Sequence, residues 1–288
     1  MPDNILFYIL FLSQIILLSY YYPNQLLKQM KAVLSNYPPD QYPKLYPKPV
    51  EYYRRGQQIY QVINLVILVI GVALLLAVVR WDDNVANKIS EALPFGYWVL
   101  QILPILIMEL LGFTNFKLMR KADTKSTRFA ELNPRRLFDF ISPAMFGVAI
   151  AMYFACLLFF YNIHQFQFHP SNDTFVIFVC LTLMNLLFAG IIIKNLRGKK
   201  LDPHQAHSDR MRQIETSIKS LFVMSIVASI FLITVEGMQV LELKRHIASL
   251  MSVYLQLTIV IGLGSMLRKI RIEDINFDVY KASAKTLK

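Results

Sequence analysis

Charged residues are scarce in this chain, and they are unevenly distributed. Only 17% of the 288 residues are Asp, Glu, Lys or Arg, whereas 55% are hydrophobic. A soluble domain has about a quarter charged residues. Several stretches of about 20 residues are almost free of charge, and the charged residues crowd into the gaps between them. This banding excludes an ordinary soluble domain and is typical of a protein that uses lipid as its solvent.

Cysteine is nearly absent. The two cysteines, Cys156 and Cys180, both fall in apolar stretches, so we interpret them as small buried hydrophobic residues and not as a disulfide or a metal pair. The apolar stretch Ile5 to Leu18 has no Lys or Arg before it, and tyrosines follow it where a cleavage site needs small residues. We therefore expect a retained first helix.

Several motifs of catalytic and cofactor sites are also missing. The chain has no glycine-rich phosphate loop, no G-x-S-x-G and no H-E-x-x-H. Its last apolar segment contains no lysine that could form a retinal Schiff base. The loops on the basic side, each about 20 to 35 residues long, are too short for a catalytic domain. No cofactor is indicated, and an enzyme is disfavoured without being excluded.

Seven apolar segments have the length of a membrane-spanning helix. They are Ile5 to Tyr22, Ile59 to Val79, Tyr97 to Phe116, Ser142 to Tyr161, Thr174 to Lys194, Ile218 to Gly237 and Ile247 to Leu267. We predict an all-α fold, a polytopic bundle of about seven transmembrane helices forming one integral membrane domain over residues 1–288.

The loops predict the orientation of this bundle. Twenty-six of the 30 Lys and Arg residues lie in alternate loops and in the tail, and only Arg80, Lys88, Lys244 and Arg245 lie on the opposite side. Basic loops stay in the cytoplasm, so we expect the N-terminus outside and the C-terminus inside. The same rule explains the net charge of +11 without nucleic acid, for which no recognition motif is present. Short loops favour a bacterial inner (cytoplasmic) membrane.

Local patterns near the segment ends give finer expectations. Aromatic rings cluster at the segment ends, where they prefer the headgroup level, which predicts an interfacial position for Tyr20 to Tyr22, Tyr52, Tyr53, Tyr60, Trp81, Tyr97, Trp98 and Tyr161. The pairs Asn133-Pro134 and Asp202-Pro203 place a cap residue before a proline, which predicts that the fourth and sixth helices begin there.

Two regions on the basic side stand apart from the helices, the loop 23–58 and the tail 268–288. The loop repeats Tyr-Pro at Tyr37, Tyr42 and Tyr46, a pattern that favours extended structure over helix. It is interpreted either as a strap across the helix ends or as a docking segment for a protein partner. Its basic residues, and those of the tail, would attract anionic lipids at the cytoplasmic face.

Glu109 in the third segment is the most informative residue. By helix rise it lies about 10 Å from the predicted cytoplasmic end, where an ionised carboxylate is costly. Pro104 favours a kink in the same helix. The polar and small residues of this helix fall within one sector of roughly 140°. They are Gln101, Pro104, Met108, Glu109, Gly112 and Asn115.

This stripe has two interpretations. It could line a path for a substrate or a proton, with Asn64 and Asn185 as polar partners on the second and fifth helices. Alternatively, Glu109 is protonated or hydrogen-bonded and serves packing, and the asparagines join helices. His204 and His207, near Asp202 and Asp209, are weak metal candidates because they lack a recognised spacing, and no metal is predicted.

Three functions agree with these features. The first is a transporter or channel for a small solute or ion, with a path lined by Glu109, Gln101, Asn115, Asn185 and Asn64. The second is a non-enzymatic membrane scaffold or assembly factor that binds lipid or a partner through its basic loops. An intramembrane enzyme acting on lipid would need a second catalytic group at the depth of Glu109, and the sequence nominates only Asn64 or Asn185.

Overall fold

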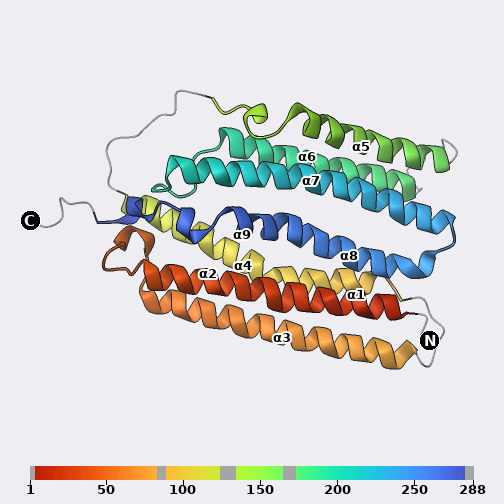
Figure 1. The fold of residues 1–288 in the computed structure, drawn as a ribbon, viewed down its shortest axis with the longest axis horizontal. Coiled ribbons are helices and arrows are strands. Elements are labelled where there is room, and N and C mark those ends of the chain that lie inside the picture. The colour runs from red at the N-terminus through yellow and green to blue at the C-terminus, as the bar shows by residue number, and fades with distance from the viewer. Residues whose placement is uncertain (1–3, 83–88, 124–133, 165–172, 283–288) are drawn as a thin grey trace, which may run out of the picture.

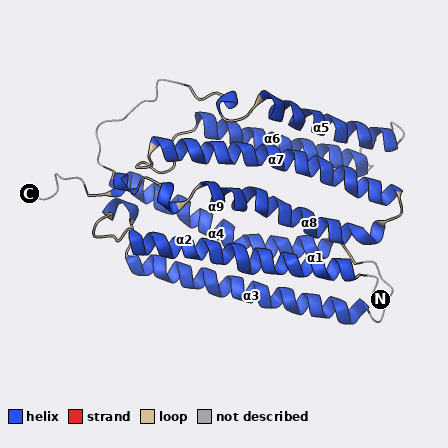
Figure 2. Cartoon of the chain, viewed as in Figure 1, coloured by secondary structure: helices blue, strands red, loops and turns tan. Residues whose placement is uncertain are grey.

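The computed structural model describes residues 4–82, 89–123, 134–164 and 173–282. Every regular element in this part of the chain is helical (Figure 2). Seven helical spans there are long and apolar enough to cross a membrane, and each coincides with one of the seven predicted segments, the fourth beginning one residue later than predicted. The prediction of an all-α, seven-span integral membrane bundle is therefore confirmed, whereas its orientation stays a prediction.

The spans extend beyond the predicted apolar cores. The first consists of α1 (Ile5–Ile16), the π-helical turn η1 (Leu17–Tyr21) and α2 (Tyr22–Asn36). The next five are α3 (Val50–Asp82), α4 (Ala92–Ala122), α5 (Pro143–Ile163), α6 (Asp173–Arg197) and α7 (His207–Val240). The last consists of α8 (Ile247–Ile259), the π-helical turn η5 (Val260–Gly264) and α9 (Ser265–Lys269).

Five short 3₁₀ turns complete the described elements. They are η2 (Pro43–Leu45), η3 (Leu137–Asp139), η4 (Lys244–His246), η6 (Ile272–Asp274) and η7 (Phe277–Tyr280).

The helices pack in two groups that share the last span (Figure 1). One group is α5, α6 and α7, and the other is the first span with α3 and α4. Helix α8 packs against α1 and α4 and also contacts α7, so it joins the groups. The strap (37–49), the α6–α7 loop (198–206) and the C-terminal segment (270–282) lie together at one end, at the left of Figure 1, which we name the basic end.

The outside of the bundle is apolar. Large aliphatic side chains that point away from the core remain more than half exposed, including Leu65, Val69, Leu110, Leu158 and Leu186. Soluble monomers rarely leave contiguous apolar patches of more than a few hundred Å² open to water. A lipid environment removes this cost, so the chain is a polytopic membrane protein whose exposed helix faces contact the bilayer.

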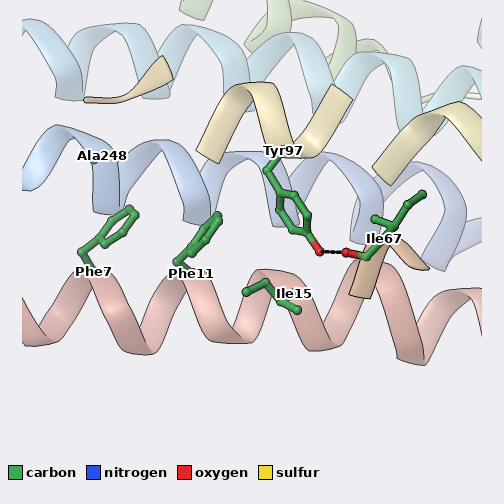
Figure 3. Close-up of a cluster of buried hydrophobic side chains, with 6 residues drawn as sticks. All are labelled: Phe7, Phe11, Ile15, Ile67, Tyr97 and Ala248. Carbon is green, nitrogen blue, oxygen red and sulfur yellow. Dashed lines mark hydrogen bonds between the residues drawn. The ribbon is translucent and has the colours of Figure 1, made fainter. Parts of the chain in front are cut away.

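Aromatic rings fill the core of the second group. Figure 3 shows Phe7, Phe11 and Ile15 of α1 packed toward neighbouring helices, with Tyr97 of α4 among them. The Tyr97 hydroxyl donates to the Ile67 carbonyl of α3 at 2.9 Å. This ring lies so close to α3 that a side chain at Gly71 would overlap its hydroxyl. Glycine at this position therefore permits the close approach of α3 and α4.

Three of the tyrosines expected at the interface pack between helices. Tyr22, Tyr60 and Tyr97 are 7%, 2% and 3% exposed, so their rings face neighbouring helices, while their depth in the membrane stays a prediction. The position of a residue near the end of an apolar segment does not reveal whether its side chain points toward neighbouring helices or away from the bundle. Tertiary packing decided that these rings serve the core.

Both predicted helix starts are also wrong. Helix α5 begins at Pro143, where the Ser142 side chain accepts from the Met145 N–H at 3.2 Å; Pro134 is outside the helix, and Asn133 lies outside the described residues. Helix α7 begins at His207. The Asp202 carboxylate accepts from the His204 N–H at 2.9 Å, a local turn that replaces the predicted cap.

Candidate functional site

The five residues predicted to line a path do not meet in one site. Glu109 is exposed on α4, between the exposed Leu106 and Leu110, and it makes no hydrogen bond or ion pair with another described residue. Its side chain therefore faces outward from the bundle, toward lipid. An unpaired carboxylate at this position is costly when ionised.

Gln101 belongs to a buried polar network between α1, α4 and α8. Its amide donates to Ser19 Oγ at 2.8 Å, and its Oε1 accepts from Gln14 Nε2 at 3.2 Å. Gln14 Oε1 accepts from Ser252 Oγ at 2.7 Å, and Ser19 bonds the Tyr97 hydroxyl at 3.0 Å. These side chains satisfy one another, as groups inside a membrane protein must. The network supports helix association.

The two asparagines on other helices also use their side chains in hydrogen bonds within the protein. Asn64 donates to the Tyr60 carbonyl of its own helix at 2.7 Å. Asn185 of α6 accepts from Ser225 Oγ of α7 at 2.5 Å and donates to the Leu181 carbonyl at 2.9 Å. The bond between Asn185 and Ser225 joins two helices.

A cavity of about 740 Å³ opens beside the last residue of the predicted stripe, Asn115. It lies between α2, α3, α4 and the last span, and the strap and the C-terminal segment border it at the basic end. Its volume is within the range of about 300–1,000 Å³ that is common for small-molecule sites. Pro104, Met108 and Gly112 also line it, so the predicted face of α4 borders a cavity, although Glu109 does not.

The deep part of the cavity is apolar. Ile63 of α3, Pro104, Ile107 and Met108 of α4, and Leu263 of the turn η5 contribute its walls. Ile63 lies about 12 Å further along α3 than Arg55, by helix rise. Pro104 lies about 16 Å from Asn115 on the antiparallel α4. The apolar part therefore extends from the basic end toward the middle of the bundle.

Near the basic end the lining is mixed. Gln29 of α2, Tyr53, Arg55 and Gln57 of α3, and Asn115 of α4 lie there among apolar side chains such as Val33, Leu34 and Ile272. The polar side chains of the cavity thus lie toward the basic end, and its deep wall, toward the middle of the bundle, is apolar. Such a distribution matches a molecule with a polar head and an apolar chain.

Three buried polar atoms occur in residues of this lining. The hydroxyls of Tyr53 and Tyr60 and the Oδ1 atom of Asn115 have no hydrogen-bond partner of normal geometry among the described residues. A buried polar group without a partner costs about 1–3 kcal/mol. These three atoms are fully buried, so they lie behind the cavity wall and do not face a ligand in the cavity.

The strap closes the polar end by folding back on the chain. The Tyr37 ring stacks on Phe277 of the C-terminal segment with ring centres 3.7 Å apart. The Tyr46 hydroxyl donates to the Tyr37 carbonyl at 2.7 Å, just beyond the end of α2. Burial, and then nearby Tyr53, raise the pKa of Tyr46 to about 12. These tyrosines are used within the chain, an arrangement that agrees with the strap interpretation.

The C-terminal segment is attached to the α6–α7 loop and to the first turn of α7 by one carboxylate each. The Tyr280 hydroxyl donates to Asp202 Oδ2 at 2.5 Å, and the Asn276 N–H donates to Asp209 Oδ2 at 3.0 Å. Both carboxylates are buried. The His204 ring lies edge-on to Tyr280. Within the described ranges, no three His, Cys, Asp or Glu side chains come together as a metal site.

The sequence contained an unused signal for the cavity. Tyr53, Gly56, Tyr60 and Ile63 recur at intervals of three and four residues and so share one face of α3. All four line the cavity. This face combines aromatic rings with a glycine, but the sequence pattern predicted an interfacial position for its tyrosines.

Comparisons with protein-family models, with curated proteins and with solved structures find no match.

Proposed function

We propose that this protein binds a lipid-like amphiphile in the cavity between α2, α3, α4 and the last span, and that it acts as a non-enzymatic binding protein of the membrane. The supporting observation is the lining: it is mainly apolar, and its few polar side chains lie toward the basic end. The sequence-based hypothesis assigned lipid binding to the basic loops, whereas this proposal assigns it to the cavity.

The apolar end favours an alkyl chain over a small polar solute. A polar solute would lose its hydration against Ile63, Pro104 and Met108 without gaining hydrogen bonds, which costs several kcal/mol. An alkyl chain carries no such cost. It can also enter from the bilayer, where chains of the same chemistry surround the protein.

The lining favours binding over chemistry. None of the described residues that line the cavity is Asp, Glu, His, Cys, Ser, Thr or Lys. General acid–base and nucleophilic catalysis use such side chains most often. Retention of the ligand by shape and polarity is therefore the activity that these residues support.

Glycine residues on α4 provide a sharp test. Gly112 lines the cavity, and a Cβ atom added there would meet no atom within 4 Å, so Gly112→Leu places its side chain toward open space in the cavity. Gly96 lies on the same helix, is exposed, does not line the cavity and also has open space. Gly96→Leu is therefore the matched control.

The measurement is photolabelling in native membranes with a long-chain alcohol that bears a diazirine in its alkyl chain. We expect saturable labelling of cavity peptides containing Met108 and Tyr60. Gly112→Leu should abolish it, and Gly96→Leu should not. Labelling that is equally strong in both variants, or that does not saturate, would contradict binding in the cavity.

Transport is a second candidate, favoured by the position of the α4 stripe. Pro104, Met108, Gly112 and Asn115 line the cavity, as a path along this helix would require. The transported molecule would then be the bound amphiphile, moved between leaflets. In proteoliposomes with a head-labelled fluorescent lipid and an external quencher, transport predicts faster loss of the protected fraction with wild type than with Gly112→Leu.

A further inference from the structure

Arg55 is the only charged residue among the described residues that line the cavity. It lies one and a half turns into α3 at the basic end. Its guanidinium makes no hydrogen bond or ion pair with another described residue. Arg135 bonds the Leu196 carbonyl and Arg212 pairs with Asp274, whereas Arg55 is exposed and, like Arg54, has no such partner among the described residues. Arg55 is therefore an available cation at the polar end of an apolar cavity.

The surroundings of Arg55 supply no counter-charge in the lining. The neighbouring polar groups are neutral: Gln29, Gln57 and Asn115, with the hydroxyls of Tyr53 and Tyr60. A guanidinium carries five N–H donors in a rigid fork that matches the two oxygens of a carboxylate or phosphate. The side-chain amides of Gln29 and Gln57 are also donors, so this end of the cavity can offer further hydrogen bonds to an anion.

Resting on the proposed binding function, we propose that the cavity selects an anionic amphiphile, with its carboxylate or phosphate head at Arg55 and its alkyl chain between Ile63 and Pro104. A carboxylate on a free fatty acid and a phosphate on a phospholipid present the same chemistry to the guanidinium. A water-soluble anion would leave the apolar end unfilled, and a cationic amphiphile would face Arg55 with like charge.

The basic loops add a long-range contribution. The net charge of +11 arises mostly from residues that flank the basic end, so this face concentrates anionic lipids before one enters the cavity. This general attraction acts on any anionic lipid near the surface and is screened by salt. Recognition at Arg55 differs because it depends on one side chain at the cavity.

Two adjacent arginines make a matched pair of variants. Arg55→Gln removes the cation that lines the cavity. Arg54→Gln removes the same charge from an exposed neighbour that does not line it. Both variants lower the net charge by one, so a difference between them cannot arise from general attraction to the surface.

The experiment compares diazirine probes with one alkyl chain and different heads: an alcohol, a carboxylate, a phosphate monoester and an amine. Labelling of cavity peptides is measured in native membranes for wild type, Arg55→Gln and Arg54→Gln. We expect the anionic probes to be preferred over the alcohol by about tenfold, the size of one charge-assisted interaction, in wild type and in Arg54→Gln. Arg55→Gln should lose the preference and keep labelling by the alcohol.

The outcomes separate this proposal from the proposed function. Cavity labelling by the alcohol with no anionic preference, or an equal preference in Arg55→Gln, would overturn the anionic head and leave the binding function standing. Absence of saturable cavity labelling by every probe would overturn both. Competition by unlabelled fatty acid or by phosphatidate supports the proposal, and the stronger competitor identifies which of the two sources supplies the ligand.

Discussion

The hydroxyl of Tyr280 donates a hydrogen bond to Oδ2 of Asp202 at 2.5 Å, across 78 positions of the chain. Both residues are buried at the basic end. This contact fastens the C-terminal segment to the α6–α7 loop, while Phe277 of the same segment stacks on Tyr37 of the strap. One short segment thus joins the two groups of helices at the end where the cavity is polar.

Removal of this hydroxyl should loosen the segment. Tyr280→Phe leaves the buried Asp202 carboxylate without its donor, and such a loss costs about 1–3 kcal/mol. We expect faster tryptic cleavage after Arg271 in purified protein. Tyr20→Phe, at an exposed tyrosine on η1, is the control and should leave the cleavage rate unchanged. Equal rates in wild type and Tyr280→Phe would show that the contact does not hold the segment.

Alkaline pH should act on the same contact. Burial, and then Asp202, raise the pKa of Tyr280 above its ordinary value of 10.0. The folded state therefore holds this proton more tightly than the unfolded state does. Its contribution to stability is complete below pH 10 and is lost as pH rises above 10. The melting temperature should fall more steeply with pH above 10 in wild type than in Tyr280→Phe. Parallel plots of melting temperature against pH for the two proteins would contradict this.

The buried glutamines should be energetically coupled. Gln14→Leu and Gln101→Leu each leave the other amide short of a partner, and we expect each to lower the free energy of unfolding by about 1 kcal/mol. The double variant should lose less than the sum, because the orphaned group is gone as well. Unfolding in mixed detergent micelles measures this, with Leu12→Ala on the exposed face of α1 as control. Strict additivity would show that the pair does not interact.

Glu109 can be tested for contact with water. In a Cys156→Ala, Cys180→Ala background, Glu109→Cys and Leu106→Cys report two exposed positions of α4. Since both face outward from the bundle, we expect an impermeant maleimide to label them equally slowly. Faster labelling at position 109 would support a water-filled path beside α4 and would favour transport.

The orientation can be tested with two exposed positions at opposite ends. Gln41 lies in the strap, and Leu241 follows α7 at the other end. In the same cysteine-free background, the positive-inside rule predicts that an impermeant maleimide applied to intact cells labels Leu241→Cys and not Gln41→Cys. The reverse pattern would invert the bundle and place the cavity in the outer leaflet.

Several local sequence patterns did not predict correctly where the helices begin and end. Asp202-Pro203 has the residues of a helix start, but its carboxylate bonds the His204 N–H and Tyr280 instead. Helix α2 continues to Asn36, well past the expected end at Tyr22, because Pro23 lies at a position where a helix start tolerates proline. Of the predicted loop 23–58, only 37–49 lies between helices.

The sequence by itself determined the seven helical spans, because a run of about 20 apolar residues must satisfy its own backbone inside lipid. It also marked the face of α4 that borders the cavity, through the helical spacing of Pro104, Met108 and Gly112. Only the tertiary structure decided that Glu109 faces outward and that Tyr60 faces inward. The reason is that the rotation of each helix is set by its neighbours: Tyr97 packs against Gly71, and Gln101 bonds Gln14, contacts between residues distant in sequence.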